Sequence, residues 1–209
     1  PPPPPLGHPL AARLLCNAGA PPFYTPGACN LRAGAGLDHG RTLIRIEGFP
    51  DSLAYRKRRL AELLSTSGEL AEVDVDDATK LWSDVADAAF LAEPRSSTLW
   101  RLSVPPTKGT SVVAAIDSSL TTRHFFDWSG GLIWLAVEDG GDDGGAATVR
   151  GAIAASGGHA SLVRGDNPLR HTEDVFHPQS SATARITAQL KKSFDPEKIL
   201  NPGFMYAGV

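Results

Sequence analysis

The sequence has little cysteine: Cys16 and Cys29 are the only two among its 209 residues. Both lie in a stretch rich in proline and glycine, and their spacing is not the C-x-x-C of a zinc site. Small secreted proteins that depend on disulfides contain cysteine far more densely. We therefore expect two free thiols in a reducing compartment, and the cytoplasm is the predicted location.

Excess positive charge and long apolar runs are also missing. The chain carries 20 basic and 23 acidic residues, so it lacks the broad positive field that nucleic acids and anionic lipids require. The basic run 56–59 lies in a helical pattern opposite leucines, which predicts a solvated helix face. No window approaches the roughly 18 apolar residues of a membrane span. We expect no nucleic-acid partner and no membrane span.

The sequence also lacks the loop types that usually hold nucleotides or hydrolyse substrates. No G-x-G-x-x-G follows an expected strand, and the paired glycines, such as 130–131 and 144–145, lie in loop contexts. No Ser/His/Asp constellation or activated cysteine is present. The chain is therefore not expected to bind a flavin nucleotide by itself, or to be a hydrolase.

Metal-binding spacing is absent as well. The acidic stretch 138–145 lacks the ordered spacing of a calcium loop and predicts a mobile, solvated loop. Asp38, His39, His171 and His177 look like scattered loop residues. We predict no metal site.

The proline content divides the chain. Residues 1–40 hold nine of the 17 prolines, which predicts an irregular linker and docking segment. Residues 41–209 read as the folded domain. It opens with a strand at 43–49 and a helix ending at Leu64, followed by a helix that runs from Asp76 towards Pro94.

From Thr98 onward, hydrophobic periodicity gives a regular order of elements. Strands are expected at 98–104, 123–128, 131–138 and 159–164, and helices at 110–119 and 146–155. Ser129-Gly130-Gly131 joins the middle strands as a tight hairpin. This βαββαβ order predicts an α+β, ferredoxin-like antiparallel sheet with helices on one face. A final helix is expected at 179–193.

Four motifs follow one another in this second half. They are L-W-R-L-S-V-P at 99–105, D-W-S-G-G-L-I-W-L at 127–135, G-G-H-A at 157–160 and F-D-P-E-K-I-L-N-P-G at 194–203. In this order they resemble the E subunits of bacterial glycolate oxidase, a family of vanillyl-alcohol-oxidase-type, FAD-linked enzymes. The resemblance covers roughly residues 40–209 and is strongest from residue 98 onward.

The resemblance implies a function that the residues alone do not. In that family an N-terminal domain carries FAD and a C-terminal cap domain closes over the flavin ring. This chain would be the cap without its FAD-binding domain, contributing to the oxidation of glycolate or a similar small 2-hydroxyacid. The implied partners are a catalytic flavoprotein paralogue and an iron–sulfur subunit, which could also hold the complex at the inner membrane. A non-enzymatic docking module of the same fold is the alternative, and part of a single-chain dehydrogenase for another hydroxyacid is a weaker one.

Catalytic members of the family carry two histidines and a glutamate that hold a divalent metal. On the same hairpin this sequence has Asp127 and Trp134 at the histidine positions, and Gly158 at the glutamate position. An indole N–H and a glycine offer a cation no lone pair. The resemblance therefore implies a relay or structural flavin subunit beside a catalytic paralogue.

Four residues remain as candidates for the cofactor side, two of them in the sheet. Arg101 could meet a carboxylate of the substrate or a partner, or pair internally with an acid such as Asp127. Trp128 could stack on a ring, and so could Trp134, although core packing is the simpler interpretation for both.

The other two candidates lie in turns. His159 could approach the flavin or transfer a proton, because its ordinary pKa is near neutrality; a hydrogen bond that stabilises the turn is the plainer alternative. Asn201 could donate its amide to a flavin carbonyl, or serve only the Asn-Pro-Gly turn.

Overall fold

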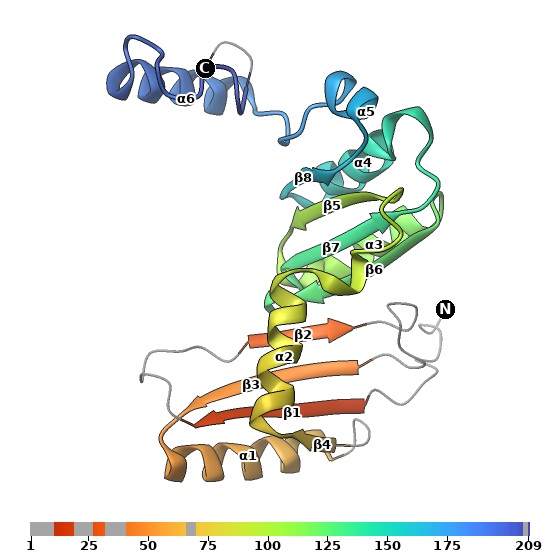
Figure 1. Cartoon of the computed structure of the whole chain (residues 1–209), viewed down its shortest axis with the longest axis vertical. Helices are drawn as coiled ribbons and strands as arrows, with labels where there is room; N and C mark the ends of the chain where they lie inside the picture. The colour runs from red at the N-terminus through yellow and green to blue at the C-terminus, as the bar shows by residue number, and fades with distance from the viewer. Residues whose placement is uncertain (1–10, 19–26, 32–40, 66–69, 207–208) are drawn as a thin grey trace.

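The computed structural model describes residues 11–18, 27–31, 41–65, 70–206 and 209. Its centre is a four-stranded sheet made of β5 (Thr98–Ser103), β6 (Thr122–Asp127), β7 (Leu132–Val137) and β8 (His159–Arg164). These strands pair antiparallel in the order β6-β7-β5-β8, with α3 (Gly109–Asp117) and α4 (Ala146–Ser156) as the connections (Figure 1). The predicted ferredoxin-like α+β fold is confirmed.

The main core lies between this sheet and the two connecting helices. Successive strand residues face opposite sides, so Trp100 and Leu102 of β5 point to α3 and α4, as do Ile133 and Leu135 of β7. All four are fully buried. The Trp100 indole also donates a hydrogen bond of 3.0 Å to the Gly144 carbonyl, which ties the core to the turn before α4.

The opposite face of the sheet is covered at one end only. There α2 (Val75–Ala86) and the short 3-10 helix η1 (Ala89–Leu91) pack on it. Val85 and Leu91 contribute to this second core together with Phe125 of β6. The chain leaves α2 well before the expected end at Pro94, because Ala88 has a left-handed φ of 51°.

Four further strands extend the sheet beyond β6. They are β1 (Ala11–Ala18), β2 (Gly27–Leu31), β3 (Arg41–Gly48) and β4 (Leu70–Val73). β1 pairs parallel to β3 and β4, and β2 pairs antiparallel to β3 and β6. Helix α1 (Pro50–Leu64) connects β3 to β4 beside this part of the sheet (Figure 1).

The strands β1 and β2 correct the expectation of an irregular linker over residues 1–40. All nine prolines of that segment lie outside the two strands. The high proline content of the segment as a whole therefore concealed two short proline-free stretches that can join a β-ladder. The rest of 1–40 lies outside the described residues. The domain boundary at residue 40 and the docking role stay predictions.

The acidic stretch 138–145 is a compact turn that contains η4 (Gly141–Asp143). The Asp143 carboxylate accepts hydrogen bonds of 2.9 Å from the backbone N–H groups of Gly145 and Ala147. Gly144 and Gly145 have positive φ values, which a residue without a Cβ adopts readily. The stretch therefore has a defined, hydrogen-bonded conformation where an open loop was expected.

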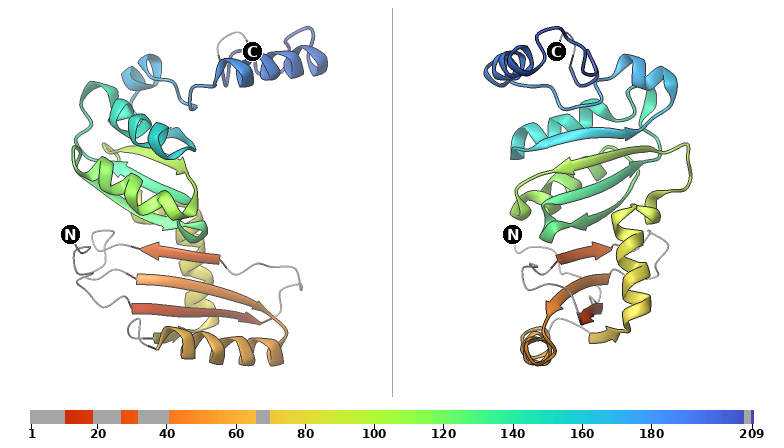
Figure 2. Two further views of the ribbon diagram at one scale, coloured as in Figure 1. Left: turned by 180° about the vertical axis from the view of Figure 1, so that it is seen from behind. Right: turned by 60° about the vertical axis from the view of Figure 1, so that its left-hand side comes forward.

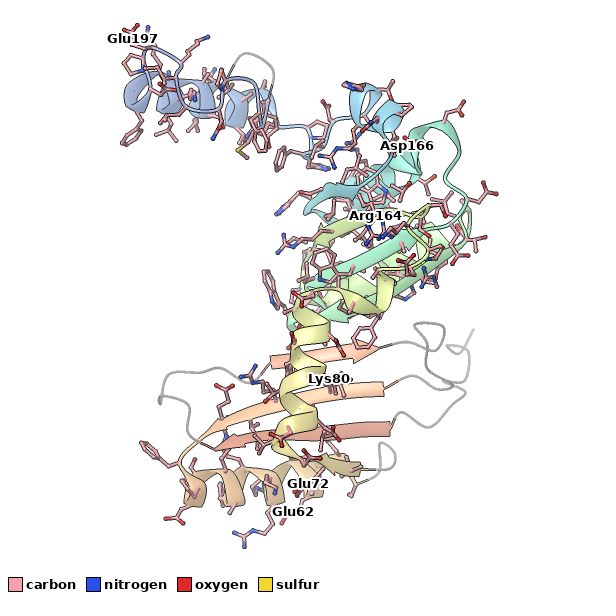
Figure 3. All side chains as sticks on the ribbon, in the orientation of Figure 1. Glu62, Glu72, Lys80, Arg164, Asp166 and Glu197 are labelled. Carbon is pink, nitrogen blue, oxygen red and sulfur yellow. The ribbon has the colours of Figure 1, made fainter. Side chains whose placement is uncertain are left out.

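The C-terminal part leaves the sheet. After α5 (Asn167–Thr172), the helix α6 (Ser181–Phe194) and the turns that follow it project away from the body (Figures 1 and 2). In Figure 3, Glu197 marks the far tip of this arm, whereas Arg164 and Asp166 lie in the body. Among the described residues, no helix is both long and apolar enough to cross a bilayer.

Arg164 fastens the loop after η1 to the last strand of the sheet. Its guanidinium donates to the carbonyls of Leu91 (3.0 Å), Ala92 (2.8 Å), Pro94 (3.3 Å) and Ser97 (3.0 Å). Hydrogen bonds from a charged donor are stronger than neutral ones, and the carbonyls would be left without this donor if it were removed.

Replacing Arg164 with methionine should therefore lower the free energy of unfolding by about 2 to 4 kcal/mol. Urea denaturation of the purified chain measures this loss. The matched control is Arg170→Met, since exposed Arg170 donates only one long bond of 3.4 Å, to the Val163 carbonyl. Equal losses in the two variants would contradict the fastening role.

Candidate functional site

Three of the residues predicted for the site, Arg101, Trp128 and His159, lie at the end of the sheet that α2 and η1 do not cover. We call this surface the open face, and it comprises Arg101, Ser103, Asp127, Trp128, Trp134, His159 and Ser161. Its strand residues alternate with those buried under α3 and α4, so they point away from the main core.

Strand register arranges the open face in two rows. In the first row, Trp134 of β7 stands opposite Arg101 of β5, which in turn stands opposite Ser161 of β8. In the second row, Ser103 of β5 stands opposite His159 of β8. Three of the four candidates predicted from the sequence, Arg101, Trp128 and His159, thus belong to one surface.

Arg101 lies close to two indole rings. Its guanidinium carbon is 5.3 Å from the centre of the Trp128 ring and 6.0 Å from that of Trp134. A cation over the face of tryptophan is attracted by the negative potential of the ring. The two rings therefore help to hold the guanidinium in place. Trp128 itself is 59% exposed, so it does not pack in the core.

The internal ion pair between Arg101 and Asp127, the alternative for this arginine, does not form. No ion pair of Arg101 occurs within the described ranges. The Asp127 carboxylate instead accepts a 2.7 Å hydrogen bond from the backbone N–H of Trp128. Burial raises the pKa of Asp127, and that hydrogen bond opposes the rise only in part. Among the described residues, no carboxylate neutralises the charge of Arg101 on the open face.

The two remaining candidates lie in different places. His159 is exposed at the start of β8, at the rim of the open face. Asn201 lies in the turn after α6, with a left-handed φ of 44°, and its carbonyl accepts a 3.2 Å bond from Phe204 N–H. Because α6 projects from the body (Figure 2), the structure does not bring Asn201 to the open face.

A steric constraint applies at Gly158, the position that corresponds to a metal-binding glutamate in the resembled family. A Cβ built there would lie 2.1 Å from the Ser103 carbonyl oxygen, and φ is +121°. No side chain fits without a backbone shift. Within the part of the chain that the structure describes, no three His, Cys, Asp or Glu residues are grouped to hold a metal ion.

Two residues outside the open face, both beside the β8 end of the sheet, were not identified from the sequence as candidates. Arg150 of α4 lies with its guanidinium carbon 5.4 Å from the Trp100 ring centre and pairs with Glu173 at 2.9 Å. Arg150 is the only charged residue of α4. A single charge in a helix without other charged residues was the feature of the sequence that could have identified it. His177, expected to be a scattered loop residue, accepts a bond from the Ala160 N–H at Nδ1, at 3.4 Å.

The structure also has a cavity of about 570 Å³, at the other end of β5 and β7. Its walls include Glu138, Asp139, Asp142 and Asp166, together with the apolar Val137. None of the four predicted site residues lines it. Its acidic lining would repel an anionic substrate or a phosphate, so this cavity is not a candidate 2-hydroxyacid site.

The motif at 194–203 forms a closed turn around one carboxylate. Buried Asp195 accepts hydrogen bonds from the N–H groups of Ile199 (2.8 Å) and Leu200 (2.9 Å), and pairs with Lys191 of α6 at 2.7 Å. Chiefly the hydrogen bond from Lys191, helped by the two N–H groups and opposed by burial, lowers the pKa of Asp195 from 3.8 to about 2. The motif therefore has a structural role here.

Comparison with known proteins gives one distant similarity. Over 133 residues, or 62% of this chain, the sequence is 30% identical to glycolate oxidase subunit GlcE of Escherichia coli strain K12. The match covers 32% of that protein, so the chain spans about a third of the length of this relative. No family model matches the sequence, and no solved structure matches the fold. The similarity supports a distant relationship to this oxidase subunit.

The turn around Asp195 should be stable above pH 3.8 and should open as the pH falls from there through about 2, because an acid with a lowered pKa stabilises the fold only while it is ionised. Hydrogen exchange of the Ile199 and Leu200 amides, corrected for intrinsic rates, measures this opening. Asp195→Asn should speed exchange at neutral pH. Glu197→Gln, an exposed change in the same turn, should leave it unaltered; an equal effect there would argue against the carboxylate.

Proposed function

We propose that this chain is the C-terminal, substrate-side domain of an FAD-dependent 2-hydroxyacid oxidoreductase of the glycolate oxidase E-subunit type. It would contribute to the oxidation of glycolate or a similar small 2-hydroxyacid. The observation that supports this most directly is the open face of a chain similar to GlcE, where Arg101 lies close to two indoles and no described carboxylate pairs with it.

Flavin supplies the chemistry of such a reaction, because it accepts the hydride of the 2-hydroxyacid. The described residues fit one part of FAD. The exposed indole of Trp128 offers a flat apolar surface of the kind that covers a ring system. His159 at the rim and the hydroxyl groups of Ser103 and Ser161 could meet its polar edge.

The described residues do not fit the pyrophosphate of FAD. The turn with Gly144 and Gly145 is lined by carboxylates, and its N–H groups already bond to Gly141, Gly140 and Asp143. Gly157 follows the C-terminus of α4, where the helix dipole repels anions. The nucleotide part would have to be held by another domain, as the part of GlcE that this chain does not match would allow.

Arg101 would bind the carboxylate of the substrate. Two indoles lie within 6.0 Å of its guanidinium carbon, and a guanidinium can bind a carboxylate through two N–H groups at once. A 2-hydroxyacid held in this way presents its α-carbon in a fixed orientation, and orientation is a large part of the catalytic gain.

The sequence changes at the family's metal positions favour a supporting role within a complex. Trp134 takes part in the Arg101 stack, and no side chain fits at position 158. The subunit that contains this chain as a domain would therefore act as a flavin-bearing relay or structural subunit beside a catalytic flavoprotein paralogue and an iron–sulfur subunit, in the cytoplasm or at the inner membrane through those subunits.

A docking module without catalytic function is the second candidate. It is favoured by the arm, on which Ile186, Leu190, Phe194, Ile199 and Phe204 are each more than half exposed. Exposed apolar area of this extent marks an interaction surface. The two candidates differ in the open face, because a pure docking module has no need for the charge of Arg101.

The purified 209-residue chain should be colourless and should oxidise neither glycolate nor lactate, because its described residues offer no site for the pyrophosphate of FAD. Visible absorption spectroscopy and a dye-reduction assay test both points. Stoichiometric flavin absorbance in the purified chain would contradict the proposal.

A chimera in which this chain replaces the matched segment of GlcE should restore glycolate oxidation to Escherichia coli cells that lack GlcE. Within that chimera, Arg101→Met should lower kcat/KM for glycolate by about 10- to 100-fold, the scale of one charge-assisted hydrogen-bonded contact. Arg170→Met is the control and should retain full activity. An Arg101→Met chimera that is as active as the control would favour the docking module.

A further inference from the structure

The root of the C-terminal arm runs along the outer edge of the sheet. β8 is an edge strand, so its outward N–H groups need acceptors. The carbonyl of Val175 accepts a 2.8 Å bond from Leu162 N–H, and His177 Nδ1 accepts from Ala160 N–H at 3.4 Å. The segment between α5 and α6 therefore closes the edge with one carbonyl and one imidazole.

The C-terminal end of the arm returns to the segment around His177. The Tyr206 hydroxyl donates to the carbonyl of His177 at 3.5 Å, and the Tyr206 ring lies 6.1 Å from that of Phe176. Beyond these contacts, α6 has no buried residue, and the ribbon stands clear of the body in both directions of view (Figure 2). His177 thus lies where the arm is joined to the sheet.

The bond to Ala160 fixes the protonation state of His177. An imidazole nitrogen that accepts a hydrogen bond carries no proton, so the attached form is the neutral ring with its proton on Nε2. If Nδ1 gained a proton, two donors would face each other across 3.4 Å. The attachment therefore exists in only one protonation state of the ring.

The groups around the ring favour its neutral form. Arg150 from α4 and His159 from β8 face it with positive or protonatable groups, and Tyr206 approaches its backbone. Of the two acids in the adjoining segment, Glu173 is paired with Arg150, and the backbone carbonyl of Asp174 accepts a hydrogen bond from the same guanidinium. Burial, then Arg150 and then His159 lower the pKa of His177 from its ordinary 6.5.

We propose that His177 is a protonation-controlled anchor: its neutral imidazole holds the C-terminal arm to the edge of β8, and its imidazolium releases the arm. The direction of the pH dependence follows from the difference in proton binding between the attached and released states. A histidine with a lowered pKa binds more protons in the released state, so attachment is favoured above pH 6.5 and is lost as the pH falls from 6.5 through the lowered value. The anchor does not depend on the proposed oxidase activity.

Nuclear magnetic resonance of the complete 209-residue chain tests the anchor. The His177 ring should titrate below 6.5, and the Ala160 amide should lose about fivefold of its hydrogen-exchange protection, corrected for intrinsic rates, across that titration. A His177 ring that titrates at or above 6.5, or an Ala160 amide whose protection does not follow the titration, would overturn the proposal.

Two variants of His177 separate protonation from structure. His177→Gln keeps an acceptor oxygen that does not titrate, so protection of the Ala160 amide should become independent of pH. His177→Phe removes the acceptor and should give the low-protection state at every pH. His171→Gln, an exposed histidine of α5, is the matched control and should keep the wild-type pH dependence; loss of the dependence in this control would assign the switch elsewhere and overturn the proposal.

Discussion

Strand β5 constrains the rest of the structure, because adjacent residues on it serve opposite faces. Trp100 is fully buried beneath α3 and α4, and its indole N–H bonds to the Gly144 carbonyl at 3.0 Å. Arg101 points the other way and lies between two exposed or half-buried indoles. A shift of β5 by one residue would place the guanidinium in the core and the Trp100 ring in solvent. The packing of the main core therefore decides where the charge of the open face stands.

The boundary of the open face is set by a loop to which Arg164 and Arg123 donate hydrogen bonds. Arg164 donates to four carbonyls between η1 and β5, and Arg123 donates to the carbonyls of Phe90 and Glu93 while pairing with Glu138. These contacts keep η1 against the sheet, where it covers one end of the face opposite α3 and α4. Among the described residues, no helix or loop is held over the other end. The polar candidate residues lie on this bare end, so the second core and the candidate site share one surface.

Local pattern predicted the elements well where each strand or helix is bounded by its own turn. The strand 159–164 has the predicted limits, because a Gly-Gly pair precedes it and Gly165 follows it. The end of α2 was misplaced, since the left-handed Ala88 breaks it before Pro94. The contact of Arg101 with Trp128 could not be predicted from the sequence, because it depends on the pairing of β5 with β7 and on the hairpin geometry. Side-chain neighbours follow from register, and register is set by the whole sheet.

The two ionisable groups of the arm respond to acid over different ranges, and this separates its internal structure from its attachment. The turn after α6 depends on a charged Asp195, whose pKa is lowered to about 2. The root depends on a neutral His177, whose pKa lies below 6.5. Under the proposed anchor, attachment of the root begins to weaken as the pH falls below 6.5, whereas the turn, in which Lys191 and the N–H groups of Ile199 and Leu200 bind the carboxylate, begins to weaken only below pH 3.8. Helix α6 and its turn would then move as one folded unit, which keeps the exposed apolar side chains of the arm together.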